Sequence, residues 1–199
     1  MRARYLEEKE IEALAECLGP YAWLPFAVAI ETGLRIGDVA ALRWDNLRGK
    51  EIAFVAQKTG KAGKAALTQE TANRLRQLHR HSVSPWIFPS EKDPSRHVSR
   101  QVLWKRLKAA CVRCRINSDG ISPHSFRKVY GVREYHAHGI AAAQRGLQHT
   151  DIATTEIYAL ADWLTEENAD KPLLRSDLGR VIRYIADWLG IPTERPPRN

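Results

Sequence analysis

The sequence feature that most constrains the fold is the apolar segment YAWLPFAVAIETG at residues 21–33. Apolar side chains lie on nearly all sides of a helix formed here, so this helix has to be buried. Gly19 and Gly33 bracket the segment, and glycine commonly ends helices because it tolerates a left-handed backbone. The preceding residues, EEKEIEALAECLG, follow an amphipathic helical pattern. The sequence therefore predicts two helices that separate at Gly19, the second of them central to the core.

The remainder of the chain has helical periodicity, with one insertion of β character. Residues 50–57 and 64–68 favour strands, and the sequence KTGKAG between them is typical of a hairpin turn. Further helices are predicted at 37–44, 68–81, 98–116, 123–139, 141–147, 152–164 and 176–190. The predicted fold class is α+β, mainly α-helical with a small antiparallel sheet.

The chain is basic, with 31 Lys and Arg against 23 Asp and Glu, a formal net charge of +8. A basic surface favours a polyanionic partner through electrostatic steering and counterion release. The N-terminus has no signal-peptide pattern. No apolar run approaches the roughly 18 residues that a membrane span requires. These observations favour nucleic acid over a membrane as the partner.

The three cysteines have no disulfide-rich pattern, which fits a reducing cytoplasm. Cys111 and Cys114 form one CxxC pair, but a structural zinc site requires a second matched pair that the sequence lacks. Both positions share a helix face, so we expect two small buried apolar groups and no metal site.

Charged residues of the kind found in reaction centres occur at two predicted helix starts. Arg35 lies in a Gly-flanked turn, and Asp38 is close enough to orient a neighbouring cation. His124 and Arg127 are three residues apart on one helix face, so both can reach a single anion. Each pair has an ordinary alternative: a structural ion pair for the first and a solvated helix face for the second.

One chemistry uses all of these residue types together with a hairpin lysine and a tyrosine. Two arginines can hold the non-bridging oxygens of a phosphodiester in transit. A lysine can protonate the leaving oxygen, and a histidine can take a proton from the nucleophile or hold a phosphate oxygen. A tyrosine hydroxyl can attack phosphorus and form a covalent phosphotyrosine, which conserves the energy of the broken bond for religation. None of these steps requires a metal.

Four motifs, TGLRIGDVAALRW, QKTGKAG, SPHSFRKVYG and LQHTDIATTEIYAL, occur in this order. Over about residues 5–163 the chain resembles the catalytic domain of the tyrosine recombinases of the phage integrase family. The resemblance implies that fold, and a site-specific recombinase that works through a 3′-phosphotyrosine without metal or cofactor. It implies a catalytic domain at 1–163 and a tail at 164–199, with an amphipathic helix at about 175–190 that docks on a neighbouring protomer or on its own domain.

The resemblance assigns six catalytic residues: two arginines, a lysine, two histidines and a tyrosine nucleophile. They are Arg35, Lys58, His124, Arg127, His149 and Tyr158. Asp38 supports them at a position where glutamate is more common, and Lys61 is the alternative to Lys58. Gln148 replaces the glycine that usually precedes His149, so the turn there departs from the family pattern.

Other basic residues are interpreted as contacts to DNA phosphates, which position a protein without specifying a sequence. They are Lys61, Lys64, Arg96, Arg100, Lys105, Arg106 and Lys108. A solvated basic helix face is the alternative for each. The implied partners are double-stranded DNA, further copies of the chain in a tetrameric synapse, and accessory DNA-bending proteins. The implied location is the cytoplasm, and the implied source is a prokaryotic or phage gene.

Three other functions use overlapping features. A type IB topoisomerase has a related constellation but relaxes supercoils, and a DNA-binding regulator keeps the fold without catalysis. A metal-dependent nuclease needs clustered carboxylates that the motifs lack. The sequence leaves no room before Arg35 for the usual N-terminal DNA-binding domain, so we expect a fragment or a reduced enzyme. The DNA target and the direction of recombination are not encoded in these motifs.

Overall fold

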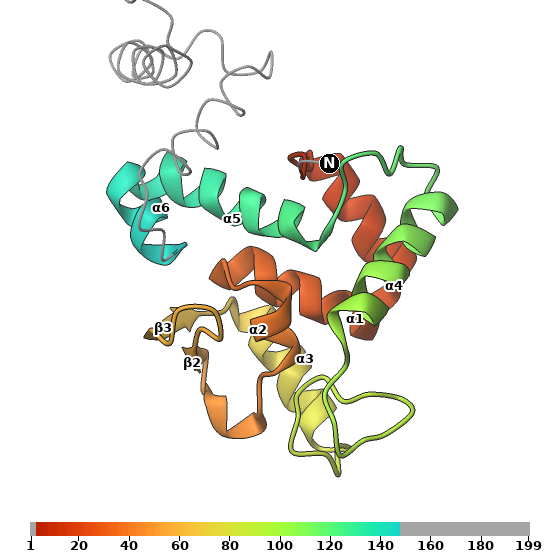
Figure 1. Cartoon of the computed structure of the whole chain (residues 1–199), viewed down its shortest axis with the longest axis vertical. Helices are drawn as coiled ribbons and strands as arrows, with labels where there is room; N and C mark the ends of the chain where they lie inside the picture. The colour runs from red at the N-terminus through yellow and green to blue at the C-terminus, as the bar shows by residue number, and fades with distance from the viewer. Residues whose placement is uncertain (1–2, 148–199) are drawn as a thin grey trace, which may run out of the picture. The chain divides into compact units, whose positions relative to one another are not determined.

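The computed structural model describes residues 3–147 of the chain (Figure 1). The chain divides into two compact units, Met1–Tyr130 and Gly131–Asn199. The predicted helices at 152–164 and 176–190, and the predicted domain boundary after residue 163, lie outside the described residues. Within residues 3–147 the chain is mainly helical with one three-stranded antiparallel sheet, which confirms the predicted fold class.

Helix α1, Glu8–Thr32, is two helical segments joined at a kink. Gly19 has φ 76° and ψ 170°, outside the helical region, and Gly33 ends the helix with φ 67°. Both breaks fall at the predicted glycines. The start is capped by Glu10, whose carboxylate accepts a hydrogen bond from the Glu7 backbone N–H at 3.0 Å.

By length and composition alone, α1 is long and apolar enough to cross a membrane, which corrects the prediction that no run approaches that length. Its apolar side chains are instead buried inside the unit: Leu14, Leu24 and Phe26 are each 0–1% exposed. The helix also contacts α2, α3 and α4. We therefore interpret α1 as the central core helix, as the sequence predicts for residues 21–33.

The sheet lies directly after the short helix α2, Ile36–Ala40, and a 3-10 turn at Trp44–Asn46. Its strands are β1 at Leu47–Arg48, β2 at Glu51–Val55 and β3 at Ala62–Ala66, in that order across the sheet. The register of β2 and β3 pairs Val55 with Ala62, so the turn between them contains Lys58. The sequence predicted β2, β3 and the hairpin but not β1, which is only two residues long.

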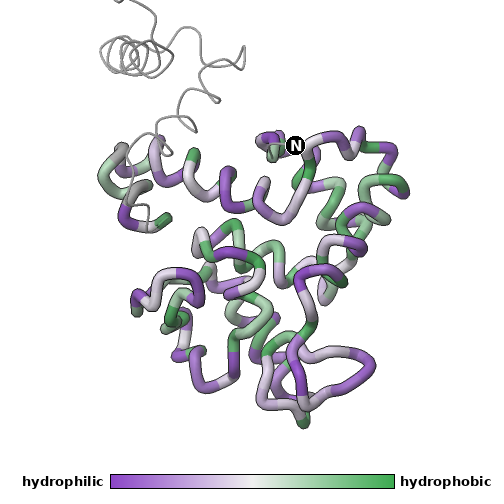
Figure 2. Tube along the Cα trace, in the orientation of Figure 1, coloured by the Kyte–Doolittle hydropathy of each residue, from purple (hydrophilic) through white to green (hydrophobic). Residues whose placement is uncertain are grey.

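Four further helices follow: α3 at Gln69–His79, α4 at Arg100–Arg113, α5 at Pro123–His138 and α6 at Ile140–Gly146. Within the first unit, α4 packs beside α1 (Figure 1). Figure 2 shows hydrophobic residues along the second half of α1 and hydrophilic residues over much of the loop before α4. In the second unit, Gly139 separates α5 from α6 with φ 79°.

Aromatic side chains fix the first turns of α5 against α1. The ring of Phe126 lies 4.8 Å from that of Phe26 and 5.7 Å from that of Trp23, measured between centroids. Phe126 is fully buried, and such pairs stabilise by roughly 0.5–1.5 kcal/mol beyond their area. The N-terminal segment braces the loop before α5, because the Arg4 backbone N–H donates to the Gly120 carbonyl at 2.8 Å. The position of the first turns of α5 is therefore set from both sides.

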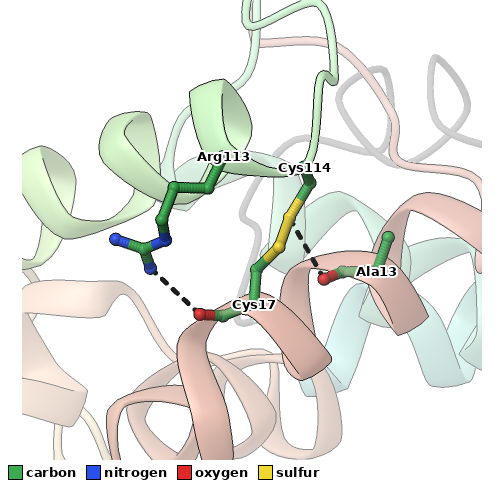
Figure 3. The surroundings of a disulfide bond; sticks show 4 residues. All are labelled: Ala13, Cys17, Arg113 and Cys114. Carbon is green, nitrogen blue, oxygen red and sulfur yellow. Dashed lines mark hydrogen bonds between the residues drawn. A yellow bond between two sulfur atoms is a disulfide. The ribbon is translucent and has the colours of Figure 1, made fainter.

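A disulfide joins Cys17 of α1 to Cys114 at the end of α4, with their Cα atoms 6.4 Å apart (Figure 3). The prediction that Cys114 is a buried apolar group was wrong, and the disulfide departs from the reducing environment that the cysteine pattern suggested. The two residues are 97 positions apart, and the packing of α4 on α1 brings them together. Cys111 is buried as predicted, and burial raises the pKa of its thiol.

Because Cys17 and Cys114 are bridged, a thiol-reactive reagent should detect one free thiol per denatured chain before reduction and three after reduction. Reduction should lower the free energy of unfolding by roughly 2–4 kcal/mol, because the bridge restricts the unfolded chain. A Cys17→Ser variant should lose this dependence on reductant. Three thiols in the protein before reduction would contradict the pairing.

Candidate functional site

Four segments that are distant in sequence line one cavity of about 510 Å³ in the first unit. They are the turn into α2, the β2–β3 hairpin, the first residue of α4 and the first turns of α5. Its lining residues are Arg35, Ile36, Gly37, Asp38, Gln57, Lys58, Arg100, Pro123, His124 and Arg127. Five of the predicted site residues, with Arg100 in addition, therefore share one cavity.

Gly33 connects the turn that carries Arg35 to helix α5. Its left-handed backbone ends α1, and Arg35 follows as the N-cap residue of α2. The Gly33 carbonyl accepts a hydrogen bond from Nη1 of Arg127, which is 3% exposed. A Cβ at Gly33 would lie 2.4 Å from Cδ1 of Tyr130, so the aromatic ring packs directly on this backbone. The two arginines are thus tied to a single rigid turn.

Asp38 anchors the hairpin that carries Lys58. Its Oδ1 accepts a hydrogen bond from the Gln57 backbone N–H at 3.0 Å, immediately before the lysine. Its Oδ2 is buried and has no hydrogen-bond partner among the described residues. The turn is closed by Gly60, whose N–H donates to the Ala56 carbonyl at 2.8 Å. Lys58 is therefore an exposed ammonium on an anchored turn, beside a carboxylate with one unused oxygen.

His124 keeps an exposed edge at the cavity, but its pKa is lowered from the ordinary value. The main cause is desolvation by the protein around the ring, followed by the positive charges of Arg127, Lys128 and Arg35. The imidazole is consequently neutral at pH 7. It then has one nitrogen that donates a hydrogen bond and one that accepts.

The predicted DNA-contact residues fall into two groups. Three have partners within the fold: Lys64 pairs with Glu51 at 2.9 Å, Arg106 pairs with Glu91, and Lys108 donates to the Ser118 carbonyl at 2.5 Å. The other four are exposed, and within residues 3–147 their side chains make no hydrogen bond or ion pair. They are Lys61, Arg96, Arg100 and Lys105. Lys61 does not line the cavity, whereas Lys58 does.

Two predicted catalytic residues, His149 and Tyr158, lie outside the described residues. The sequence interpretation missed two residues, one that lines the cavity and one that acts on His124 from outside its lining. Arg100 was grouped with remote phosphate contacts, although it lines the cavity. Lys128 is 8% exposed and contributes to the lowered pKa of His124, a role that its position four residues after the histidine could have indicated. Among residues 3–147, no His, Cys, Asp and Glu cluster could hold a metal ion.

A helical fold with an inserted hairpin and a cationic cavity can be compared with those of known protein families. The model of the phage integrase family matches residues 4–163. The chain belongs to the phage integrase family.

Individual relatives agree with this assignment. The chain is 28% identical over 173 residues to the tyrosine recombinase XerD of Agrobacterium fabrum, covering 74% of this chain and 52% of that protein. It is similar in fold to the crystal structure of XerA recombinase, with a TM-score of 0.68 at 17% identity, covering 99% of this chain and 65% of that one. It is also similar in fold to a lambda integrase dimer bound to a COC′ core site, with a TM-score of 0.66 at 16% identity. That match covers 79% of this chain and 48% of the integrase chain. The chain spans about half the length of the curated relatives it matches.

The Gly33 turn should tolerate no side chain. Gly33→Ala places a Cβ 2.4 Å from the Tyr130 ring on a left-handed backbone, a conformation that costs about 1–3 kcal/mol before any clash. We expect a larger loss in wild type than in a Tyr130→Ala background, measured by chemical denaturation. Equal losses in both backgrounds would show that the ring does not pack on Gly33.

The pKa of the His124 imidazole should lie below the ordinary histidine value of about 6.5, because desolvation and, after it, three nearby cations oppose its protonation. Its ring signals, assigned by their absence in His124→Gln, give the midpoint by NMR. Lys128→Met should move this midpoint upward by removing one positive charge. A wild-type midpoint at or above about 6.5 would contradict the described surroundings.

Proposed function

We propose that the chain is the catalytic domain of a site-specific DNA recombinase, which cuts and rejoins strands through a 3′-phosphotyrosine. The observation that carries the proposal is the convergence of Arg35, Lys58, His124 and Arg127 on one cavity from separate segments. Residues 1–163 form the catalytic domain in this proposal, and residues 164–199 form the tail. The family match over residues 4–163 supports the assignment.

The two arginines hold the phosphodiester that is cut. Arg127 is buried and oriented by the Gly33 carbonyl, and Arg35 is half-buried on the next turn. Guanidinium groups offer forked donors that match two non-bridging oxygens. Because the protein fixes them in advance, they stabilise the charge that grows on these oxygens in the transition state.

Proton transfer uses the other two residues and a tyrosine. The Tyr158 hydroxyl attacks phosphorus and loses its proton to the neutral His124 imidazole. The bond from phosphorus to the 5′ oxygen breaks as Lys58 donates a proton to that oxygen. Asp38 holds the hairpin in place for this donation. The second histidine, His149, takes part at the same phosphate. Rejoining reverses each transfer, so the phosphotyrosine conserves the bond.

The proposed substrate is double-stranded DNA, and the proposed assembly is a tetramer of the chain on two duplexes, with accessory DNA-bending proteins as further partners. The net charge of +8 supports a polyanionic substrate. Solved relatives include a lambda integrase tetramer bound to a Holliday junction, which supports the same assembly here. The proposed location is the cytoplasm, because the proposed substrate is DNA, and the proposed source is a prokaryotic or phage gene.

Covalent trapping tests the proposal without a known target sequence. A pool of nicked suicide duplexes with randomised arms is incubated with the protein in EDTA, and adducts that survive denaturant are recovered. The duplexes recovered with the wild-type protein should have one nucleotide sequence in common. Tyr158→Phe should form no adduct with that sequence but should still bind it. Arg127→Ala should slow adduct formation by about a hundredfold or more.

Each of three other outcomes would contradict the proposed function and favour another one. No wild-type adduct on any duplex, with binding retained, would indicate a DNA-binding regulator. Cleavage that disappears in EDTA would indicate a metal nuclease. Adducts that relax supercoiled DNA but never join strands of two different duplexes would indicate a topoisomerase.

A further inference from the structure

The cavity contains one more arginine than cleavage of a single phosphodiester requires. Arg100 lines the cavity together with Arg35, Arg127 and Lys58, so the lining has four cationic side chains and one carboxylate, that of Asp38. Oδ1 of Asp38 already accepts from the Gln57 N–H. A phosphodiester carries a single negative charge. The excess of positive charge therefore matches a ligand with more than one phosphate.

The position of Arg100 is set by the protein backbone. Ser99 caps α4 by accepting a hydrogen bond from the Val102 N–H at 3.3 Å. The Val98 N–H donates to the Phe88 carbonyl at 2.8 Å, which holds the approach to the helix. Arg100 is the first residue of α4, so the positive end of this helix adds to the potential at the cavity. Its place at the cavity is thus a feature of the fold and not of a loose loop.

The three arginines differ in burial, and this difference separates their roles. Arg127 is 3% exposed and held by Gly33, and Arg35 is half-buried. Arg100 is exposed, and within residues 3–147 its side chain has no hydrogen bond or ion pair. A buried, oriented guanidinium can stabilise developing charge, whereas an exposed one acts through water with a weaker and less directional attraction. Arg100 is therefore suited to binding a phosphate whose charge does not change.

We propose that Arg100 binds the DNA phosphate adjacent to the one that is cut. Along one strand a phosphate follows about every 3.4 Å of helix axis, so the neighbour of a phosphate held by Arg35 and Arg127 lies at the edge of the same cavity. This contact is equal in the ground state and the transition state, and it strengthens DNA binding without accelerating cleavage. The proposal rests on the proposed recombinase function, because it assumes that a DNA strand occupies the cavity.

The test measures binding and cleavage separately on the site recovered by trapping. Binding is measured in the Tyr158→Phe background at several salt concentrations, and cleavage is measured at saturating DNA in the presence of Tyr158. Arg100→Ala should weaken binding by about tenfold. It should also reduce the slope of the logarithm of the binding constant against the logarithm of the salt concentration by about one, the value for one lost phosphate contact. It should leave the saturated cleavage rate within a few-fold of wild type. Arg80→Ala, which removes an exposed arginine outside the cavity, is the matched control and should change neither.

A neutral methylphosphonate identifies the phosphate directly. Placed next to the cleavage position, it should weaken wild-type binding and have little further effect on Arg100→Ala. If the variant loses the same affinity as wild type, or binds like Arg80→Ala, the proposed contact does not exist. If Arg100→Ala slows saturated cleavage as strongly as Arg35→Ala, Arg100 acts on the phosphate that is cut, and the proposal is wrong. Absence of wild-type adducts refutes the recombinase function. The binding of Arg100→Ala and Arg80→Ala is then compared on a duplex selected by non-covalent binding, and equal affinities refute the contact of Arg100.

Discussion

The hydrogen bond from Arg127 to the Gly33 carbonyl is the interaction on which the site depends. Gly33 can accept it because its left-handed backbone ends α1 and turns the chain into α2. The Tyr130 ring then packs on the same glycine, where a Cβ would not fit. This one residue therefore aligns the α5 segment that bears His124 and Arg127 with the turn that bears Arg35. The core contacts of Phe126 with Phe26 and Trp23 keep the first turns of α5 in this alignment with α1.

The chemistry follows from a gradient of burial across the cavity. Arg127 is deepest and oriented by the backbone, His124 is held neutral by desolvation and nearby cations, and Lys58 is exposed on an anchored hairpin. In the proposed reaction, the guanidinium of Arg127 that holds the phosphate is buried, and the ammonium of Lys58 that donates the proton is exposed. Asp38 joins the two regions, because it is buried on α2 and binds the hairpin backbone. The cavity thus combines an arginine that the backbone orients with an exposed ammonium on an anchored hairpin.

Local features of this fold were predictable from sequence, and long-range pairings were not. The helix ends at Gly19 and Gly33 and the hairpin around Lys58 depend on backbone preferences of a few neighbouring residues, which the sequence shows directly. The Cys17–Cys114 disulfide depends on how α4 packs on α1.

The same limit applies to the charged residues of the site. Arg106 is paired with Glu91, 15 positions away, so its predicted role as a phosphate contact could not be judged from the basic pattern of α4. The place of Arg100 in the cavity likewise depends on where α4 begins in space. The catalytic roles stay predictions that rest on the family motifs, since no property of Arg35 or His124 in isolation separates a reaction centre from a solvated helix face.

The most direct test of the central claim is a chemical rescue at the leaving oxygen. If Lys58 protonates the 5′ oxygen in a cavity where Arg35 and Arg127 hold the phosphate, a sulfur in place of that oxygen removes the need for the proton. Lys58→Ala should then be nearly inactive on ordinary suicide DNA and recover on the sulfur-bridged duplex, while Arg127→Ala should stay inactive on both. Failure of Lys58→Ala to recover, or equal recovery of both variants, would contradict the assignment of these residues to one phosphate.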